Sequence, residues 1–316
     1  MRPLMSLARL VCALFPFILI GASPGAAFAQ SDAPDQIIHF TGPGGETIDG
    51  GVWLPAGAAD GSPRPLIVIS HGNSGWYRGH SDTAEALTEA GFVVASLTHP
   101  GDNFQDQSRG LMLTGRAPQL SALIDYMTAS WSGPVAIDDA RIGAFGFSAG
   151  GFTVTSIIGG VSDAGAIQAH CAVEPQVFAC RLVAMFGGLD LANWRPETRD
   201  ERVKAAVIAA PAFGLSFTDA SLAGVTVPVQ LWQAADDQIL PSPFNVEPVR
   251  DRLGGTVDYH RVENAGHYDF LTPCAPEMRA AMPELCTSPP GFDRAAFKVA
   301  FNTEVVRFFR EALGEP

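Results

Sequence analysis

The sequence predicts an α/β fold in which helices flank a mainly parallel sheet, with a cap inserted after one of the central helices. Three observations predict it. Short continuous apolar runs, typical of parallel strands buried on both faces, recur along the chain. Stretches with apolar residues at helical spacing separate these runs. The alternation stops between Val161 and Arg202, where no clean period is present.

The N-terminal half begins with an expected hairpin of residues 36–40 and 47–54, closed by the turn-rich segment 41–45. Residues 66–70 are a β-branched run and predict the first buried strand. A helix over 82–89, ended by Gly91, and a buried strand over 92–97 follow. Apolar residues at helical spacing then predict a helix over 118–130.

The second half continues with a strand over 141–147 and a helix over 150–158. The segment 161–202 is expected to form a cap over the sheet. Alternation resumes after it, with expected strands at 203–210, 227–234 and 257–262 and helices at 245–253 and 292–313. Strand–helix alternation of this kind implies right-handed crossovers and one domain over residues 30–316.

The first 29 residues have the features of a secretory signal peptide. Arg2 and Arg9 give a basic start, and the apolar run 10–21 is too short to span a bilayer comfortably. Ala27-Phe28-Ala29 places small residues where a signal peptidase reads them. We expect cleavage near Ala29 and an exported protein, periplasmic or secreted. The alternative is an uncleaved membrane anchor.

Composition limits the possible partners. The 316-residue chain is 47% hydrophobic, which is enough for a substantial core, and its formal net charge is −13. Removing the leader makes the charge more negative because it takes away two arginines. An acidic surface argues against nucleic acid or an anionic membrane as partner, and it does not bear on a neutral small-molecule ester.

Four cysteines remain once the leader and its Cys12 are removed: Cys171, Cys180, Cys274 and Cys286. An even number in an exported chain predicts disulfides. Three pairings are possible, and the local one, Cys171–Cys180 with Cys274–Cys286, is favoured. Free buried thiols are the alternative. The chain has no CxxC pair, so the spacing does not resemble a zinc site.

The main chemical signal is Gly146-Phe147-Ser148-Ala149-Gly150, placed between a predicted strand and a predicted helix. A serine at such a turn takes a strained conformation that lifts its hydroxyl above the sheet, and the small flanking residues let backbone pass closely. Ala149 then lies at the helix N-terminus, where its N–H can face a developing oxyanion. The alternative is an ordinary Gly/Ser turn.

A second signal, Ser70-His71-Gly72-Asn73, follows the first long buried strand. The loop at this place supplies the other oxyanion N–H in the architecture that the serine turn implies, and Asn73 is the expected donor. His71 is expected to brace the loop rather than to act as a base.

A serine hydroxyl needs a neighbouring base, and the base needs an acid that holds its tautomer. Of the seven histidines, His267 lies after the last predicted strand, where the order serine, acid, histidine places the base. The acid should follow the preceding strand, where Asp236 and Asp237 both qualify. His260, inside the strand, is expected to point into a helix layer or solvent.

These motifs occur in the order and spacing of α/β-hydrolases. The stretch ISHGNSGWYRGHSDTAEALTEAGFVVASLTHPGDN further resembles the corresponding stretch of the dienelactone hydrolase-like and platelet-activating-factor acetylhydrolase-like serine esterases. The resemblance as a whole covers most of residues 60–270. The resemblance implies the α/β-hydrolase fold and, through a DxxxP pattern, Asp237 as the acid. It also implies that Asn73 donates an oxyanion N–H. Dienelactone hydrolases themselves use cysteine where this chain has Ser148, so that name does not indicate the substrate.

The expected function is therefore hydrolysis of small or short-chain carboxylic esters through an acyl-enzyme, with no cofactor. A lactonase, a polyester depolymerase, a peptidase and a non-catalytic binding protein on the same fold are the alternatives. Trp76 and Trp232 either line an acyl pocket or pack in the core. Asp102 and Asn103, which follow a strand near His99, are candidates for substrate contact, and a metal role there lacks further ligands.

Overall fold

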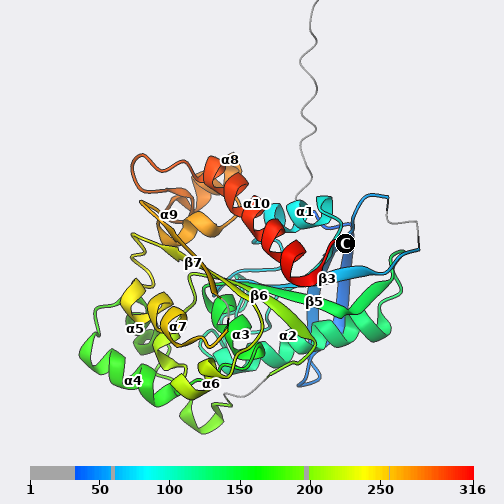
Figure 1. Cartoon of the computed structure of the whole chain (residues 1–316). Coiled ribbons are helices and arrows are strands. Elements are labelled where there is room, and N and C mark those ends of the chain that lie inside the picture. Colours follow the sequence, from blue (N-terminus) through cyan, green and yellow to red (C-terminus); the bar gives the residue numbers. More distant parts are fainter. Residues whose placement is uncertain (1–32, 58–60, 196–198, 256) are drawn as a thin grey trace, which may run out of the picture. The chain divides into compact units, whose positions relative to one another are not determined.

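The described residues form an eight-stranded sheet in the order β1-β2-β4-β3-β5-β6-β7-β8 (Figure 1). The computed structural model describes residues 33–57, 61–195, 199–255 and 257–316. The predicted signal peptide therefore lies outside the described residues. β1 pairs with β2 and β2 with β4 in antiparallel orientation, and the remaining neighbours are parallel.

The strands are β1 (Gln36–Thr41), β2 (Thr47–Trp53), β3 (Arg64–Ser70), β4 (Val93–Leu97), β5 (Ile137–Phe147), β6 (Val203–Ala209), β7 (Val229–Ala234) and β8 (Val257–Val262). All of them lie where the sequence predicts strands. β3, β4, β6 and β7 are buried along most of their length, as continuous apolar runs require, whereas the edge strand β8 is half-buried.

The α-helices are α1 (Ser81–Glu89), α2 (Arg116–Asp125), α3 (Ala149–Ile157), α4 (Ala164–Val173), α5 (Phe178–Met185), α6 (Asp219–Ala223), α7 (Val246–Arg252), α8 (Pro276–Ala281), α9 (Pro283–Cys286) and α10 (Arg294–Leu313). Short 3₁₀ turns are η2 (Leu113–Gly115), η4 (Leu191–Asn193), η5 (Gly214–Ser216), η6 (Ser242–Phe244) and η7 (His267–Phe270). The helix predicted over 118–130 begins earlier and ends as a π-helical turn, η3 (Tyr126–Ser130).

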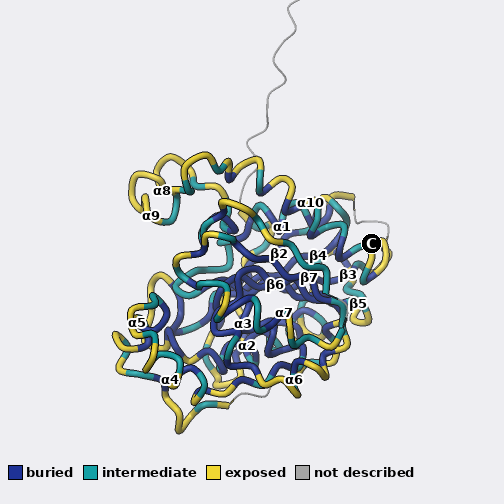
Figure 2. Tube along the Cα trace, turned by 60° about the vertical axis from the view of Figure 1, so that its left-hand side comes forward, coloured by how far each residue is buried: buried dark blue, intermediate teal, exposed yellow. Residues whose placement is uncertain are grey.

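Helices cover both faces of the sheet. Alternate residues of β3 show the two layers, because Ile67 and Ile69 pack with α1 and α10, while Leu66 and Val68 pack with α2 and α3. Figure 1 shows these two helix pairs on opposite sides of the strands. Figure 2 shows the buried sheet at the centre and the exposed segment of α8 and α9 at the periphery.

The segment 161–202, for which the sequence predicts no period, contains the helices α4 and α5 and the turn η4. A disulfide between Cys171 and Cys180 joins the two helices, and a second one links Cys274 to Cys286 at the end of α9. These are the local pairings favoured from the spacing. Every helix in the described part of the chain is too short or too polar to cross a membrane.

Candidate active site

Ser148 lies between the last residue of β5 and the first residue of α3, with φ 58° and ψ −118°. Non-glycine residues rarely adopt a positive φ, and such strain persists only where the surroundings impose it. The two glycines of the motif provide the room. A Cβ on Gly150 would lie 1.9 Å from the Ser70 carbonyl oxygen, and one on Gly146 would lie 2.1 Å from the Gly150 oxygen. Only glycine fits either position.

His267 is the first residue of η7 and approaches the serine from the loop after β8. Its Nε2 lies 3.0 Å from Ser148 Oγ, which is within hydrogen-bonding distance. The ring packs against Phe147, with centroids 4.8 Å apart. The loop is held by Asp269, whose Oδ2 accepts from the Gly266 N–H at 2.7 Å. These contacts fix the direction in which the imidazole faces.

Asp237, in the loop after β7, completes a chain of hydrogen bonds. Its Oδ2 lies 2.6 Å from His267 Nδ1, and its Oδ1 accepts from the N–H groups of Ile239 and Leu240 at 2.9 and 2.7 Å. An ionised carboxylate only accepts, so the proton of the neutral ring lies on Nδ1. Nε2 is then free to accept from Ser148. Asp236 is exposed and makes main-chain contacts: its N–H donates to Ala265 O, and its carbonyl oxygen accepts from Gln238 Nε2 at 3.4 Å.

The His267–Asp237 pair is almost fully enclosed, with side chains 2% and 3% exposed. Low local dielectric strengthens the electrostatic interaction between a protonated imidazole and the carboxylate. The arrangement can therefore support a ring that gains a proton while the serine loses one.

The loop after β3 runs directly beside the serine. A Cβ on Gly72 would lie 3.3 Å from Ser148 Cβ and 3.1 Å from Phe147 Cδ1, so the main chain leading into Asn73 is close to the hydroxyl. The Asn73 side chain points elsewhere, donating to Asp102 Oδ1 at 2.6 Å and to Gly110 O at 3.2 Å. Ala149 opens helix α3, where first-turn N–H groups have no acceptor within the helix.

His71 braces this loop, as the sequence predicts. Its Nδ1 lies 2.6 Å from Gly72 O, and its Nε2 accepts from the His99 N–H at 3.0 Å. His99 in turn contacts Ser70 Oγ and Gln119 Oε1. Burial, and then the charge of Arg116, hold the pKa of both rings well below 6.5. Both histidines are therefore neutral structural residues at physiological pH.

For three residues that the sequence leaves open as substrate contacts, the structure favours a role within the fold. Trp232 is 5% exposed and packs against His260, Phe270 and Phe301 under α10. It belongs to the core, because its position in β7 directs it to the face that α10 covers.

Asp102 and Asn103 are likewise buried, and their polar atoms are used within the chain. Asp102 accepts from Asn73, Ser74 and Arg116. Asn103 binds His99 O and two N–H groups of its own loop. Trp76 is half-buried beside Phe104, with ring centroids 5.4 Å apart, and its contact with substrate stays a prediction.

Sequence reasoning missed two buried arginines that support the site loops. Arg116, from the start of α2, contacts the loop after β3, and Arg294, from the start of α10, donates to Asp269 Oδ1 at 3.0 Å. Arg294 also donates to Leu285 O at 2.8 Å, which connects the Cys274–Cys286 segment to the loop of His267. Among the described residues, no group of three or more His, Cys, Asp or Glu side chains is placed to hold a metal ion.

Comparison with known proteins places this geometry in a recognised fold. No protein-family model and no curated protein sequence matches the chain. Among solved structures, a ferulic acid esterase from Streptomyces cinnamoneus is 20% identical, with a TM-score of 0.58 over 89% of this chain and 92% of its own. An alpha-beta serine hydrolase homologue from Coxiella burnetii is 15% identical, with a TM-score of 0.51 over 87% and 97%. The chain has the α/β-hydrolase fold.

A puromycin-hydrolyzing peptidase from Mycobacterium tuberculosis has the same fold, with 16% identity and a TM-score of 0.59 over 89% of this chain. The chain covers only 39% of that protein's length. In this fold the turn after the central strand presents the nucleophile, which is where Ser148 lies. The comparisons do not single out the dienelactone hydrolase-like or acetylhydrolase-like subgroup, and that resemblance stays a prediction.

Proposed function

We propose that this chain is a serine hydrolase that cleaves small or short-chain carboxylic esters, with Ser148 as nucleophile, His267 as base and Asp237 as the orienting acid. The observation that carries the proposal is the hydrogen-bond chain from Ser148 Oγ through both nitrogens of His267 to Asp237. It lies at the carboxyl ends of the parallel strands, where open α/β sheets bind ligands.

In the first half of the reaction, Ser148 Oγ attacks the ester carbonyl while His267 Nε2 takes its proton. The carbonyl carbon becomes tetrahedral and its oxygen carries the negative charge. His267 then gives the proton to the leaving alcohol, and the carbon–oxygen bond of the ester breaks. The acyl group stays on Ser148.

The main-chain N–H groups of Asn73 and Ala149 are the proposed oxyanion donors. Two features support this assignment: the main chain around Gly72 passes beside Ser148, and Ala149 opens a helix whose N-terminal dipole favours negative charge. Removing one such donor in other serine hydrolases costs about 10²- to 10³-fold in kcat.

In the second half, a water molecule gives a proton to His267 and attacks the acyl carbon. The tetrahedral intermediate collapses, Ser148 recovers its proton from His267, and the acid leaves. In every proton transfer of this cycle, the His267 side chain is the group that accepts or gives the proton.

The ester is favoured over the peptide because this chain spans 92% of the length of the ferulic acid esterase and only 39% of the length of the peptidase. We further propose that the segment 161–202 acts as a cap that sets acyl-chain length. The position of Phe186, just after α5, supports this proposal. Both the Phe186 ring and the Asn73 side chain lie close to Gly110, because a Cβ on Gly110 would be 3.2 Å from Phe186 Cζ and 3.4 Å from Asn73 Nδ2. This end of the cap therefore lies against Gly110, whose carbonyl oxygen accepts from the Asn73 side chain.

The predicted signal peptide and the two disulfides support export to the periplasm or the medium, where disulfides persist. The acidic charge of the chain argues against nucleic acid as a partner.

The direct test is the hydrolysis of p-nitrophenyl esters with acyl chains of two to about twelve carbons. We expect turnover that Ser148→Ala abolishes and Ser156→Ala preserves. Ser156 lies on the same helix, buried, with its hydroxyl donating to Phe152 O. Full activity in Ser148→Ala contradicts the assignment of the nucleophile. Lactone, polyester and peptide substrates in the same panel test the alternatives. A preference for the peptide contradicts the ester assignment, and a preference for the lactone or the polyester contradicts the small, short-chain ester as substrate.

A further inference from the structure

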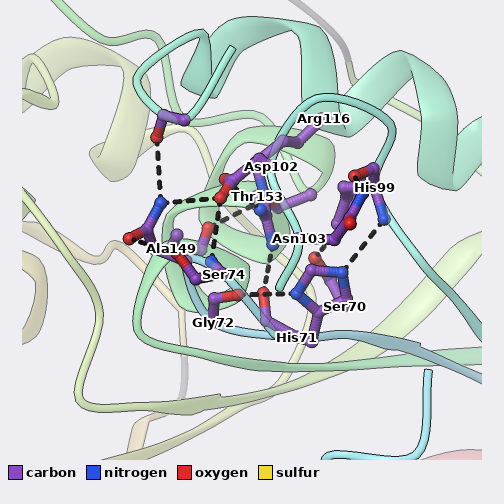
Figure 3. Close-up of polar contacts among 12 residues, drawn as sticks. Ser70, His71, Gly72, Ser74, His99, Asp102, Asn103, Arg116, Ala149 and Thr153 are labelled. Atoms are coloured by element: carbon purple, nitrogen blue, oxygen red, sulfur yellow. Dashed lines mark hydrogen bonds and ion pairs between the residues drawn. The ribbon is translucent and has the colours of Figure 1, made fainter. Parts of the chain in front are cut away.

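A buried ion pair lies next to the proposed oxyanion donors and takes no part in the proton transfers above. Arg116 and Asp102 have side chains that are 2% and 4% exposed, and Arg116 Nη1 donates to Asp102 Oδ2 (Figure 3). Burial lowers the pKa of the Arg116 guanidinium, and the Asp102 carboxylate opposes that effect. Burying two charges costs free energy that a pair alone often does not recover.

Asp102 holds the main chain just after Asn73. Its Oδ1 accepts from the Ser74 N–H at 2.9 Å and from the Asn73 side-chain amide at 2.6 Å. Ser74 has φ 58°, a conformation that a non-glycine residue adopts only when its surroundings compensate for the cost. The carboxylate thus fixes the peptide unit between Asn73 and Ser74.

Arg116 holds the main chain just before Asn73. Its Nη2 donates to His71 O, which belongs to the peptide unit between His71 and Gly72. The N–H of Asn73 belongs to the intervening unit, between Gly72 and Asn73. The ion pair therefore secures the peptide units on both sides of the proposed donor, one through each partner (Figure 3).

The same guanidinium reaches the second donor's helix. Arg116 Nε donates to Thr153 Oγ1 at 3.1 Å, and the Thr153 hydroxyl donates to Ala149 O at 2.9 Å. Ala149 is the first residue of α3 and carries the other proposed N–H. Figure 3 shows the contacts that link Arg116 with His71, Asp102 and Thr153.

We propose that Arg116 and Asp102 are the positioning pair of the oxyanion site, which set the spacing and direction of the Asn73 and Ala149 N–H groups. This inference rests on the proposed serine-hydrolase function. The donors interact most strongly with the charged tetrahedral state, so loss of their alignment lowers kcat more than it raises KM. A pair that only stabilises the fold predicts altered stability with unchanged kinetics.

Asp102→Asn tests the carboxylate. The amide oxygen can still accept from Ser74, but the amide nitrogen then faces the Arg116 guanidinium, donor against donor. Thr153→Val tests the other arm with a smaller change. Its matched control is Thr155→Val on the same helix, because the Thr155 hydroxyl makes the same bond to the carbonyl four residues earlier, Gly151 O at 2.8 Å, and Arg116 is not its partner.

The readout is the ratio of kcat/KM for an aryl ester to that for the matching thionoester, whose sulfur is a poor acceptor for an oxyanion site. We expect kcat of Asp102→Asn to fall about 10- to 100-fold on the ester, with KM within about threefold and a reduced ester-to-thionoester ratio. The kcat of Thr153→Val on the ester should fall less, by about threefold to tenfold, and the kcat of Thr155→Val should match that of the wild type. Circular dichroism and thermal unfolding establish that each variant is folded.

Folded variants with wild-type kcat, or a lower kcat with an unchanged ratio, overturn the positioning role. Should Asp102→Asn fail to fold, Thr153→Val against Thr155→Val still decides the question. Failure of the parent proposal is distinguishable, because the wild type would then show no ester turnover or Ser148→Ala would remain active. If Ser148→Ala is inactive while Asp102→Asn and Thr153→Val keep the wild-type kinetics, only the positioning role of the pair is refuted.

Discussion

Asp237→Asn is a sharp test of how the acid works, because the structure dictates how the amide must lie. Oδ1 of Asp237 accepts from two main-chain N–H groups, those of Ile239 and Leu240. An amide NH₂ cannot take that place, so the asparagine oxygen stays there and the NH₂ turns toward His267. His267 Nδ1 must then accept, which moves the ring proton to Nε2.

A ring with its proton on Nε2 cannot accept the proton of Ser148, although size and packing are unchanged. In serine proteases the same tautomer change lowers kcat about 10⁴-fold, which corresponds to about 5.4 kcal/mol of activation free energy. We expect a similar loss here, with KM altered by less than about threefold, since the acid does not contact the substrate.

The assay is steady-state hydrolysis of p-nitrophenyl acetate near pH 7.5, with the folded fraction established by circular dichroism. Asp236→Asn is the matched control, because that neighbouring side chain is exposed, and it should keep its activity within about twofold. If Asp237→Asn kept more than about a tenth of kcat, or if Asp236→Asn lost activity instead, the reasoning about the tautomer would be wrong.

Three further predictions concern the framework. Gly150→Ala should prevent stable folding, since its Cβ would lie 1.9 Å from the carbonyl oxygen of Ser70, the last residue of β3. A Cβ on Gly115 would have nothing within 4 Å, so Gly115→Ala should leave the midpoint of thermal unfolding unchanged or higher. Equal midpoints for the two variants would refute the steric argument. Cys286→Ser removes the disulfide that closes the loop from Cys274 to Cys286, and it should lower the free energy of unfolding, measured by urea titration, by about 2–4 kcal/mol. An unchanged free energy of unfolding would argue against a structural role for this disulfide. Burial lowers the pKa of His80 from 6.5 to about 3, so its contribution to stability is complete above pH 6.5 and is lost as pH falls toward 3. His80→Leu should reduce the pH dependence of the unfolding free energy in that window by up to about 1.4 kcal/mol per unit, and an unchanged slope would contradict the burial argument.

The strands and the positions of Ser148 and His267 could be predicted because local signals and chain order agree. Buried parallel strands are short β-branched runs, and a glycine-flanked serine directly after one leaves few structural alternatives. The choice between Asp236 and Asp237 needed the resemblance, because both follow the strand and only the turn geometry decides which side chain faces inward.

The helices of segment 161–202 escaped prediction for a physical reason. Residues 164–173 are apolar on most sides, so they show no amphipathic period, and α5 is only eight residues long. The side chain of Trp232 faces α10, but strand periodicity does not say which helix covers which face.

The role of Arg116 could not be predicted, because a charged residue at the start of a helix is ordinarily exposed. Its partners lie 14, 37 and 45 positions away in the chain, at Asp102, Thr153 and His71. Contacts of this kind depend on the tertiary arrangement of β3, β4 and α3, which residue spacing does not encode.

Covalent labelling is the most direct test of Ser148 as an activated nucleophile. The folded chain is treated with a fluorophosphonate probe, digested and mapped by mass spectrometry. We expect one modified serine, Ser148, with labelling lost in Ser148→Ala and strongly slowed in His267→Ala, because the proposed base, His267 Nε2, lies 3.0 Å from the Ser148 hydroxyl oxygen. No labelling of the folded wild-type chain, as a non-catalytic binding protein would show, or labelling of another serine, would contradict this expectation.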